Sequence, residues 1–114
     1  MLPKSHRLPA FIFDRVLGSD KRIISDKLRI FIRANSLPVS RFGIVVSSKA
    51  VPRAHSRNRC KRLVRETIRL NLAKIRSGLD VVILINSDIS AMSQREVAEL
   101  LLEIWHKNGI INDT

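Results

Sequence analysis

The segment from His55 to Arg76 constrains the fold more than any other, because it separates apolar and basic residues at helical spacing. Its apolar residues recur at intervals of three, four or seven positions: Cys60, Leu63, Val64, Ile68, Leu72 and Ile75. This pattern is typical of a helix with one buried face, and such a helix needs an apolar layer to cover. We therefore predict a long helix over 55–76, ended by Ser77 and by Gly78 in the left-handed conformation.

Two segments upstream supply strands for that layer. The stretch Lys27–Ala34 alternates between two faces, as a half-buried strand does. One face carries three aliphatic residues, which are Leu28, Ile30 and Ile32. The other face carries an aromatic ring between two cations, in Arg29, Phe31 and Arg33. A second strand over Arg41–Ser47 follows a turn at Asn35–Ser40, so the two strands are predicted to form an antiparallel hairpin.

The remaining elements are one buried strand and two terminal helices. The continuous apolar run within Asp80–Asn86 predicts a central strand that is covered on both faces. A first helix is predicted over His6–Leu17, with Phe13, Val16 and Leu17 at helical spacing. A last helix starts at Ser93, which has capping-box spacing to Glu96, and it ends at Gly109. Its predicted buried residues are Val97, Leu100, Leu101, Ile104 and Trp105.

This order of elements predicts an α+β protein. We expect a single domain over residues 1–114, an α/β sandwich in which one sheet has helices packed on it. The longest apolar run, Val81–Ile85, is far shorter than the roughly 20 residues that a membrane span requires. The N-terminal residues lack the pattern of a secretory signal, so we expect a cytoplasmic protein without membrane partners.

The charge distribution points to a nucleic acid. The chain of 114 residues has 21 Lys and Arg, 10 Asp and Glu and a net charge of +11, and residues 49–76 contain ten of these cations and one acid. Four cations on the long helix follow one another at four-residue intervals and predict a basic ridge: Arg57, Lys61, Arg65 and Arg69. A solvated face normally mixes charges, whereas phosphates would convert the repulsion along this ridge into attraction. Charge alone does not distinguish structured RNA from a DNA groove.

The sequence does not assemble a protein active site. The single cysteine, Cys60, excludes an internal disulfide and is interpreted as a small core residue. The three histidines, His6, His55 and His106, have no metal-ligand spacing, so no metal is predicted on the protein. Catalytic protein residues are therefore not expected.

The segment Ser48–Arg69 resembles the signature of the bacterial ribonuclease P protein subunit, whose Arg-Asn-Arg helix is matched by Arg57, Asn58 and Arg59. Weaker similarity covers most of the chain. The resemblance implies a ribosomal protein S5 domain 2-like fold with a left-handed βαβ crossover, an exception to the usual handedness. It also implies contacts between the catalytic RNA and the basic segment. Together with Arg69, the last residue of the ridge, the predicted RNA-binding residues are Lys49, Arg53, Arg57, Asn58, Arg59, Lys61, Arg62, Arg65 and Arg69. For Asn58, contact with a base edge and capping of a backbone group remain alternatives.

The resemblance further implies a cleft that holds the single-stranded 5′ leader of precursor tRNA. Its predicted residues are Phe13, Arg29, Phe31 and Arg33, since a ring flanked by cations suits single strands. Core packing is the alternative for Phe13 and Phe31. The protein would then be a subunit of an endoribonuclease that produces mature tRNA 5′ ends, with one protein per RNA. The RNA and its bound Mg²⁺ would carry the catalysis.

Two other classes of protein are alternatives to this interpretation. A basic ribosomal protein would share the composition, but the gapless Arg-Asn-Arg segment argues against it. A DNA-binding regulator would need a dimerisation element or a second helix placed for helix-turn-helix docking, and neither is evident.

Overall fold

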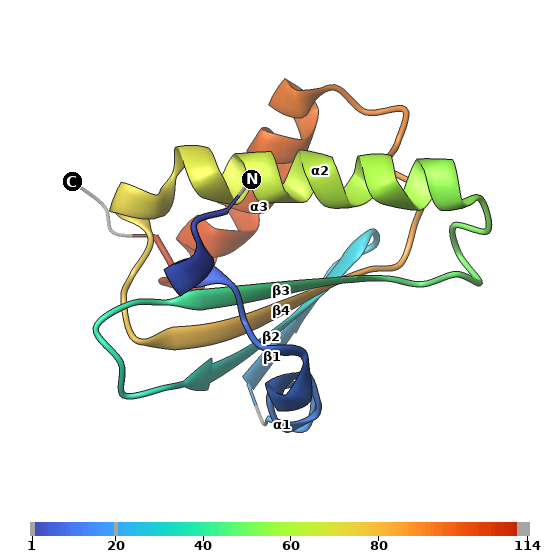
Figure 1. Ribbon diagram of the computed structural model, residues 1–114. Coiled ribbons are helices and arrows are strands. Elements are labelled where there is room, and N and C mark those ends of the chain that lie inside the picture. Colours follow the sequence, from blue (N-terminus) through green and yellow to red (C-terminus); the bar gives the residue numbers. More distant parts are fainter. Residues whose placement is uncertain (1, 20, 112–114) are drawn as a thin grey trace.

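Strand β4 (Leu79–Ile85) is the centre of the fold, which a computed structural model describes for residues 2–19 and 21–111 (Figure 1). The sheet has the order β1-β2-β4-β3. β4 pairs antiparallel with β2 (Leu28–Ala34) and parallel with β3 (Arg41–Val46), while β1 (Lys21–Ile24) lies at the edge beside β2. The prediction of a central strand from the continuous apolar run is confirmed.

Helices cover both faces of this sheet. Helices α2 (Ala54–Leu70) and α3 (Gln94–Lys107) lie on one face, and the short α1 (Phe13–Leu17) lies on the other (Figure 1). Three 3₁₀ turns complete the chain: η1 (Lys4–His6), η2 (Ala10–Ile12) and η3 (Leu72–Lys74). The predicted α+β architecture, one sheet with helices packed on it, is therefore confirmed.

The alternation of β4 divides the interior into two cores. Val81, Ile83 and Ile85 face α2 and α3 in the larger core, together with Leu28, Ile30 and Ile32 of β2. Val82 and Phe31 face α1 in the smaller core with Val16. A strand whose residues are apolar on both faces needs a cover on each, which explains why the sheet is a middle layer.

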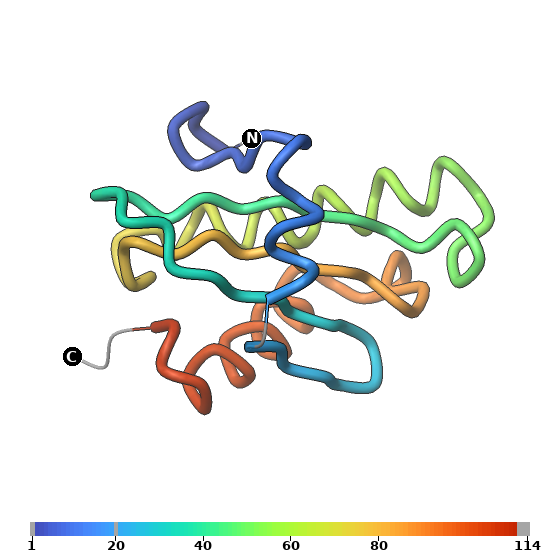
Figure 2. The backbone as a smooth tube through the Cα atoms, turned by 90° about the horizontal axis from the view of Figure 1, so that it is seen from below, coloured from blue at the N-terminus to red at the C-terminus, as the bar shows by residue number. Residues whose placement is uncertain are grey.

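The connection from β3 through α2 to β4 is left-handed. In Figure 1 both strands run from left to right with β3 in front of β4, and α2 returns above them. Figure 2 shows the same strands from below in the order β3, β4, β2. Most crossovers of this kind are right-handed, so the expected exception is present.

The predicted hairpin between the second and third elements is wrong. Residues Lys27–Ala34 and Arg41–Ser47 do contain β2 and β3, but β4 lies between them and they do not pair. The turn Asn35–Ser40 instead carries the chain past the start of β4. Adjacent strands pair by default, but here β4 requires a partner at both edges because most of its residues are buried.

Helix boundaries also differ from the prediction. The basic helix ends at Leu70, not Arg76, and η3 follows it before the extended Ile75. Gly78 does adopt a positive φ of 82°, but it does so in the turn before β4. The predicted helix His6–Leu17 consists of two 3₁₀ turns and the five-residue α1. Strand β1 was missed because it is a short and mostly exposed edge.

The last helix lies where it is predicted, although two of its predicted buried residues, Leu100 and Ile104, are only half-buried. Ser93 accepts a hydrogen bond from the backbone of Glu96, whose side chain accepts one from the Ser93 backbone. Val97, Leu101 and Trp105 are fully buried, and Trp105 packs against Phe42 with ring centroids 6.4 Å apart. Gly109 follows the helix with a φ of 71°.

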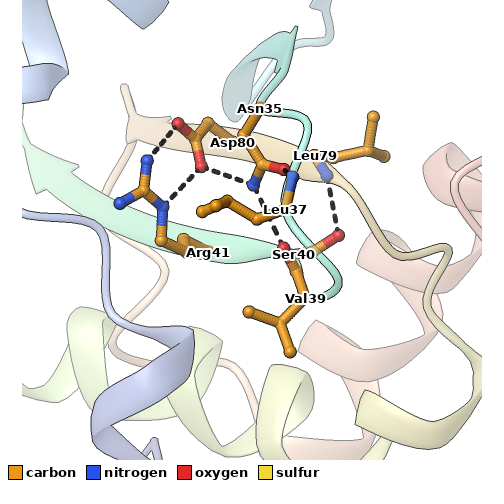
Figure 3. A network of polar contacts seen from close by, with 7 residues as sticks. All are labelled: Asn35, Leu37, Val39, Ser40, Arg41, Leu79 and Asp80. Atoms are coloured by element: carbon orange, nitrogen blue, oxygen red, sulfur yellow. Dashed lines mark hydrogen bonds and ion pairs between the residues drawn. The ribbon is translucent and has the colours of Figure 1, made fainter.

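A buried polar cluster fixes the start of β4 (Figure 3). The Asp80 carboxylate accepts hydrogen bonds from Arg41 Nε and Nη2, both at 2.8 Å, and from Asn35 Nδ2 at 2.9 Å. Ser40 Oγ accepts a bond from the Leu79 backbone at 3.0 Å. The ends of β2, β3 and β4 are therefore joined by polar contacts that satisfy a buried charge.

Replacing Asp80 by Ala should destabilise the protein by about 3 to 5 kcal/mol, because it leaves Arg41 and Asn35 without their partner in a mostly buried site. Urea denaturation followed by circular dichroism measures the change. The control is Glu99→Ala, which removes the partner of an exposed arginine on α3 and should leave the midpoint almost unchanged. Equal midpoints for the two variants would contradict the structural role of Asp80.

Candidate nucleic-acid interface

Helix α2 presents its cations to solvent because its apolar face packs against the sheet. Cys60, Leu63, Val64 and Ile68 are buried in the larger core. Most residues that lie between them in the sequence project away from the sheet, and most of the basic side chains are exposed. Burial raises the pKa of the Cys60 thiol, so its interpretation as an unreactive core residue is consistent with its environment.

Three of the predicted RNA-binding arginines have protein partners. Arg57 Nη1 donates to the carbonyl oxygens of Val51 at 3.0 Å and Pro52 at 2.8 Å, so it holds the loop that precedes α2. Arg59 Nε donates to the Ser90 carbonyl at 2.6 Å, on the flank that faces the loop before α3. The predicted ridge therefore does not consist entirely of free cations.

The third engaged arginine lies at the end of the ridge. Arg69 forms an ion pair with Glu66, and its Nε donates to Glu66 Oε2 at 3.0 Å. The Arg69 hydrogen bond holds the pKa of Glu66 below its usual value, so both groups are charged at neutral pH.

The other five cations predicted to bind RNA, and Asn58, have no hydrogen-bond or ion-pair partner among residues 2–19 and 21–111. The cations Lys49, Arg53, Arg62 and Arg65 are exposed and Lys61 is half-buried. Asn58 is also exposed, and the N-cap residue of α2, Arg53, receives no side-chain cap. Backbone capping by Asn58 therefore finds no support, and contact with a base edge stays a prediction.

On the other side of the molecule, α1 crosses over the sheet (Figure 2). Phe31 lies beneath it and is only 8% exposed, in contact with the smaller core that includes Val16. Arg29 and Arg33 are exposed on the same strand face, about 7 Å to either side of Phe31. The structure thus favours the packing alternative for Phe31, and stacking of a base on it would require α1 to move.

Phe13 is the first residue of α1 and lies over β3. A Cβ atom built on Gly43 would be 2.3 Å from the Phe13 ring, so the ring rests directly on the backbone of this strand. A hollow of about 310 Å³ opens beside it, and its lining includes Phe13, Gly43, Arg7 and Arg65. Arg65 of α2 and Phe13 of α1 therefore meet at one place, although they were assigned to separate surfaces.

The sequence interpretation missed Arg7 and Gly43. A glycine inside a strand is a signal of close approach by another group, and this signal could have identified Gly43. Arg7 has no comparable local signal, because it reaches the hollow only through the bridge between the N-terminal segment and Phe42 of β3.

The described residues contain no group of three or more His, Cys, Asp and Glu side chains placed to hold a metal ion. Within the same residues, no helix has the length and apolarity needed to cross a membrane.

Known proteins are similar to this chain in sequence and in fold. Residues 2–109 match the family described as Ribonuclease P. The Ribonuclease P protein component of Edwardsiella ictaluri is 34% identical over 96 residues, which cover 84% of this chain and 80% of that protein. The corresponding protein of Pectobacterium atrosepticum is 36% identical with the same coverage. This chain belongs to the ribonuclease P protein family.

Solved structures of ribonuclease P proteins have the same fold. The protein from Thermotoga maritima has a TM-score of 0.79 at 30% identity, covering 89% of this chain and 96% of that one. The Staphylococcus aureus protein has a TM-score of 0.82 at 21% identity over 96% of this chain and all of that one, which supports the fold. The resemblance carried by Ser48–Arg69 is therefore confirmed as ribonuclease P family membership, while the roles of single residues stay predictions.

The engaged and free arginines of this ribonuclease P protein should differ in stability experiments. Arg57→Ala removes two hydrogen bonds to the loop before α2 and should lower the free energy of unfolding by about 1 kcal/mol. Arg62→Ala removes an exposed side chain that has no partner among the residues that the structure describes, and it should leave the unfolding midpoint unchanged. A destabilisation by Arg62→Ala as large as that by Arg57→Ala would contradict the division into engaged and free cations.

Proposed function

We propose that the protein binds the catalytic RNA of ribonuclease P through the free cations of its basic segment, with one protein per RNA in the cytoplasm. The observation that carries this proposal is a concentration of unneutralised charge: residues 49–76 have ten cations, and only Arg69 forms an ion pair within the described residues. Mutual repulsion of these cations is costly in the free protein. Phosphates and the counterions that they release would convert that cost into binding free energy.

The same surface favours folded RNA over protein partners. Arginine predominates among the predicted contacts, and its planar fork donates two parallel hydrogen bonds to phosphate or to a guanine edge. Asn58 lies among these cations with a free amide, which suits contact with a base edge. Arg57 and Arg59 contribute positive charge while they hold the flanking loops in place.

The proposed substrate is precursor tRNA, whose 5′ leader would lie along α1. Phe13 is half-exposed beside a hollow that has Arg7 and Arg65 in its lining, so a base can approach the ring while cations contact the backbone. Arg29 and Arg33 extend the positive surface across β2. Phe31 supports this surface from below as part of the smaller core.

Cleavage of the leader is assigned to the RNA subunit and to Mg²⁺ bound by that RNA. The ions would activate water and stabilise the leaving oxygen. The protein would supply affinity for the precursor and reduce the repulsion between two polyanions. Its residues are assigned to binding and not to bond cleavage.

The charge proposal is tested by the double variant Arg62→Glu and Arg65→Glu, which spares the structural Arg57. Binding of the ribonuclease P RNA should weaken by at least a hundredfold at moderate salt, because both phosphate contacts become repulsive. The matched control, Arg95→Glu with Lys107→Glu, makes the same charge change on α3. Loss of cleavage of precursor tRNA in the reconstituted enzyme should follow the loss of RNA affinity. If both double variants weaken RNA binding equally, the net charge of the protein determines RNA affinity, and the location of the cations on α2 does not.

The leader proposal is tested by comparing two phenylalanines. Phe13→Ala should weaken binding of precursor tRNA relative to mature tRNA by about 1 to 3 kcal/mol, since only the precursor has a leader to stack. Phe31→Ala should instead destabilise the fold by about 3 to 5 kcal/mol, because it opens a cavity beneath α1. Equal loss of affinity for precursor and mature tRNA in Phe13→Ala would refute leader contact by this ring.

A further inference from the structure

A second basic depression lies on the side of α1 away from Arg29. Two hollows, of about 190 Å³ and about 350 Å³, share Arg15 of α1 and Arg33 of β2 in their linings. We call this surface the Arg15–Arg33 groove. Arg33 follows Arg29 by four strand residues, so the groove opens about 13 Å along β2 from Arg29, beyond the point where α1 crosses.

The groove has an excess of positive charge that the protein does not neutralise. The lining of the smaller hollow includes Arg15, Arg33, Arg41 and Asp80, a net charge of +2. Both carboxylate oxygens of Asp80 are already occupied by Arg41, and Asn35 donates to one of them (Figure 3). Arg15 and Arg33 have neither an ion pair nor a side-chain hydrogen bond in the part of the chain that the structure describes. Two unpaired guanidinium groups therefore border one concave surface.

A phosphodiester is the ligand that fits this arrangement. Its oxygens can accept hydrogen bonds from two guanidinium forks at once, and its negative charge would relieve their repulsion. The lining of the smaller hollow also includes the polar side chains of Asn35, Arg41 and Asp80, beside the apolar Ile12 and Ala34.

An exposed aromatic ring lies on the helical turn that precedes Arg15. Phe11 is 84% exposed, which makes it the most exposed large apolar side chain among the described residues. It precedes Arg15 by four residues, in the 3₁₀ turn η2 that leads directly into α1. An open ring next to unpaired arginines is the combination that single-stranded nucleic acids use for stacking and backbone contact.

We infer that the Arg15–Arg33 groove binds a phosphate of the 5′ leader and that Phe11 stacks on a neighbouring unpaired base. This inference rests on the proposed function and extends it. A leader that passes from α2 through the hollow beside Phe13 must cross α1 to reach the groove. The groove therefore contacts nucleotides farther from the cleavage site than those at Phe13.

The test uses the reconstituted enzyme with mature tRNA and with precursors that have a leader of about five or about fifteen nucleotides, within the range of single-strand site sizes. Arg15→Ala should lower the affinity for the long-leader precursor about tenfold, with a much smaller loss for the short leader. It should also reduce the slope of log affinity against log salt by about 0.7, the value for one phosphate of a single strand. Phe11→Ala should lower long-leader affinity by a similar factor but leave the salt slope unchanged.

The control is Arg95→Ala, which removes one exposed cation from α3 on the opposite face of the sheet. If Arg15→Ala and Phe11→Ala have the same affinity for the long-leader precursor as this control, leader binding at the groove is refuted. Equal losses of affinity for the short-leader and long-leader precursors would also refute it. The same data separate the two proposals. If the unmodified enzyme does not distinguish the short-leader precursor from mature tRNA, leader binding itself fails, and the groove with it. If it does distinguish them but gains no affinity from the added nucleotides, only the groove is refuted.

Discussion

Burial of β4 on both faces is the constraint on which the rest of the structure depends. Every residue of this strand from Asp80 to Ile83 is buried, and the alternating side chains enter two different cores. The strand can satisfy its backbone only between two other strands, and its side chains only between two helical layers. The separation of α1 from the other helices is a consequence of this position.

The polar cluster at Asp80 adds specificity to that hydrophobic arrangement. Apolar strands such as β2 and β4 could pair in several registers with little change in burial, whereas one carboxylate with three donors fits one arrangement of the three strand ends. Because Asp80 is paired with Arg41, it does not pair with Arg15 or Arg33 nearby. A contact that stabilises the fold therefore also preserves positive charge on the α1 face.

The attachment of α2 to the sheet determines which cations are available to RNA. Arg57, Arg59 and Arg69 interact with protein groups, so the identity of a residue as arginine does not establish a free phosphate contact. The remaining cations follow the outer side of the helix from its N-terminal loop to Arg65, which lines one hollow together with Phe13 of α1. The proposed surfaces for the catalytic RNA and for the leader would thus adjoin each other. This arrangement would place the substrate beside the RNA that cleaves it.

The sequence by itself determined the elements whose signals are local. The heptad-like apolar stripe of α2, the alternation of β2, the apolar run of β4 and the Ser93 capping box each depend on spacing within one segment, and so does the identification of Arg57, Asn58 and Arg59. Only the tertiary structure decided that β4 separates β2 from β3, that Phe31 is covered by α1, and that Arg65 lies near Phe13. These facts depend on contacts between residues that are far apart in the chain, and local spacing contains no information about which buried surface will cover another.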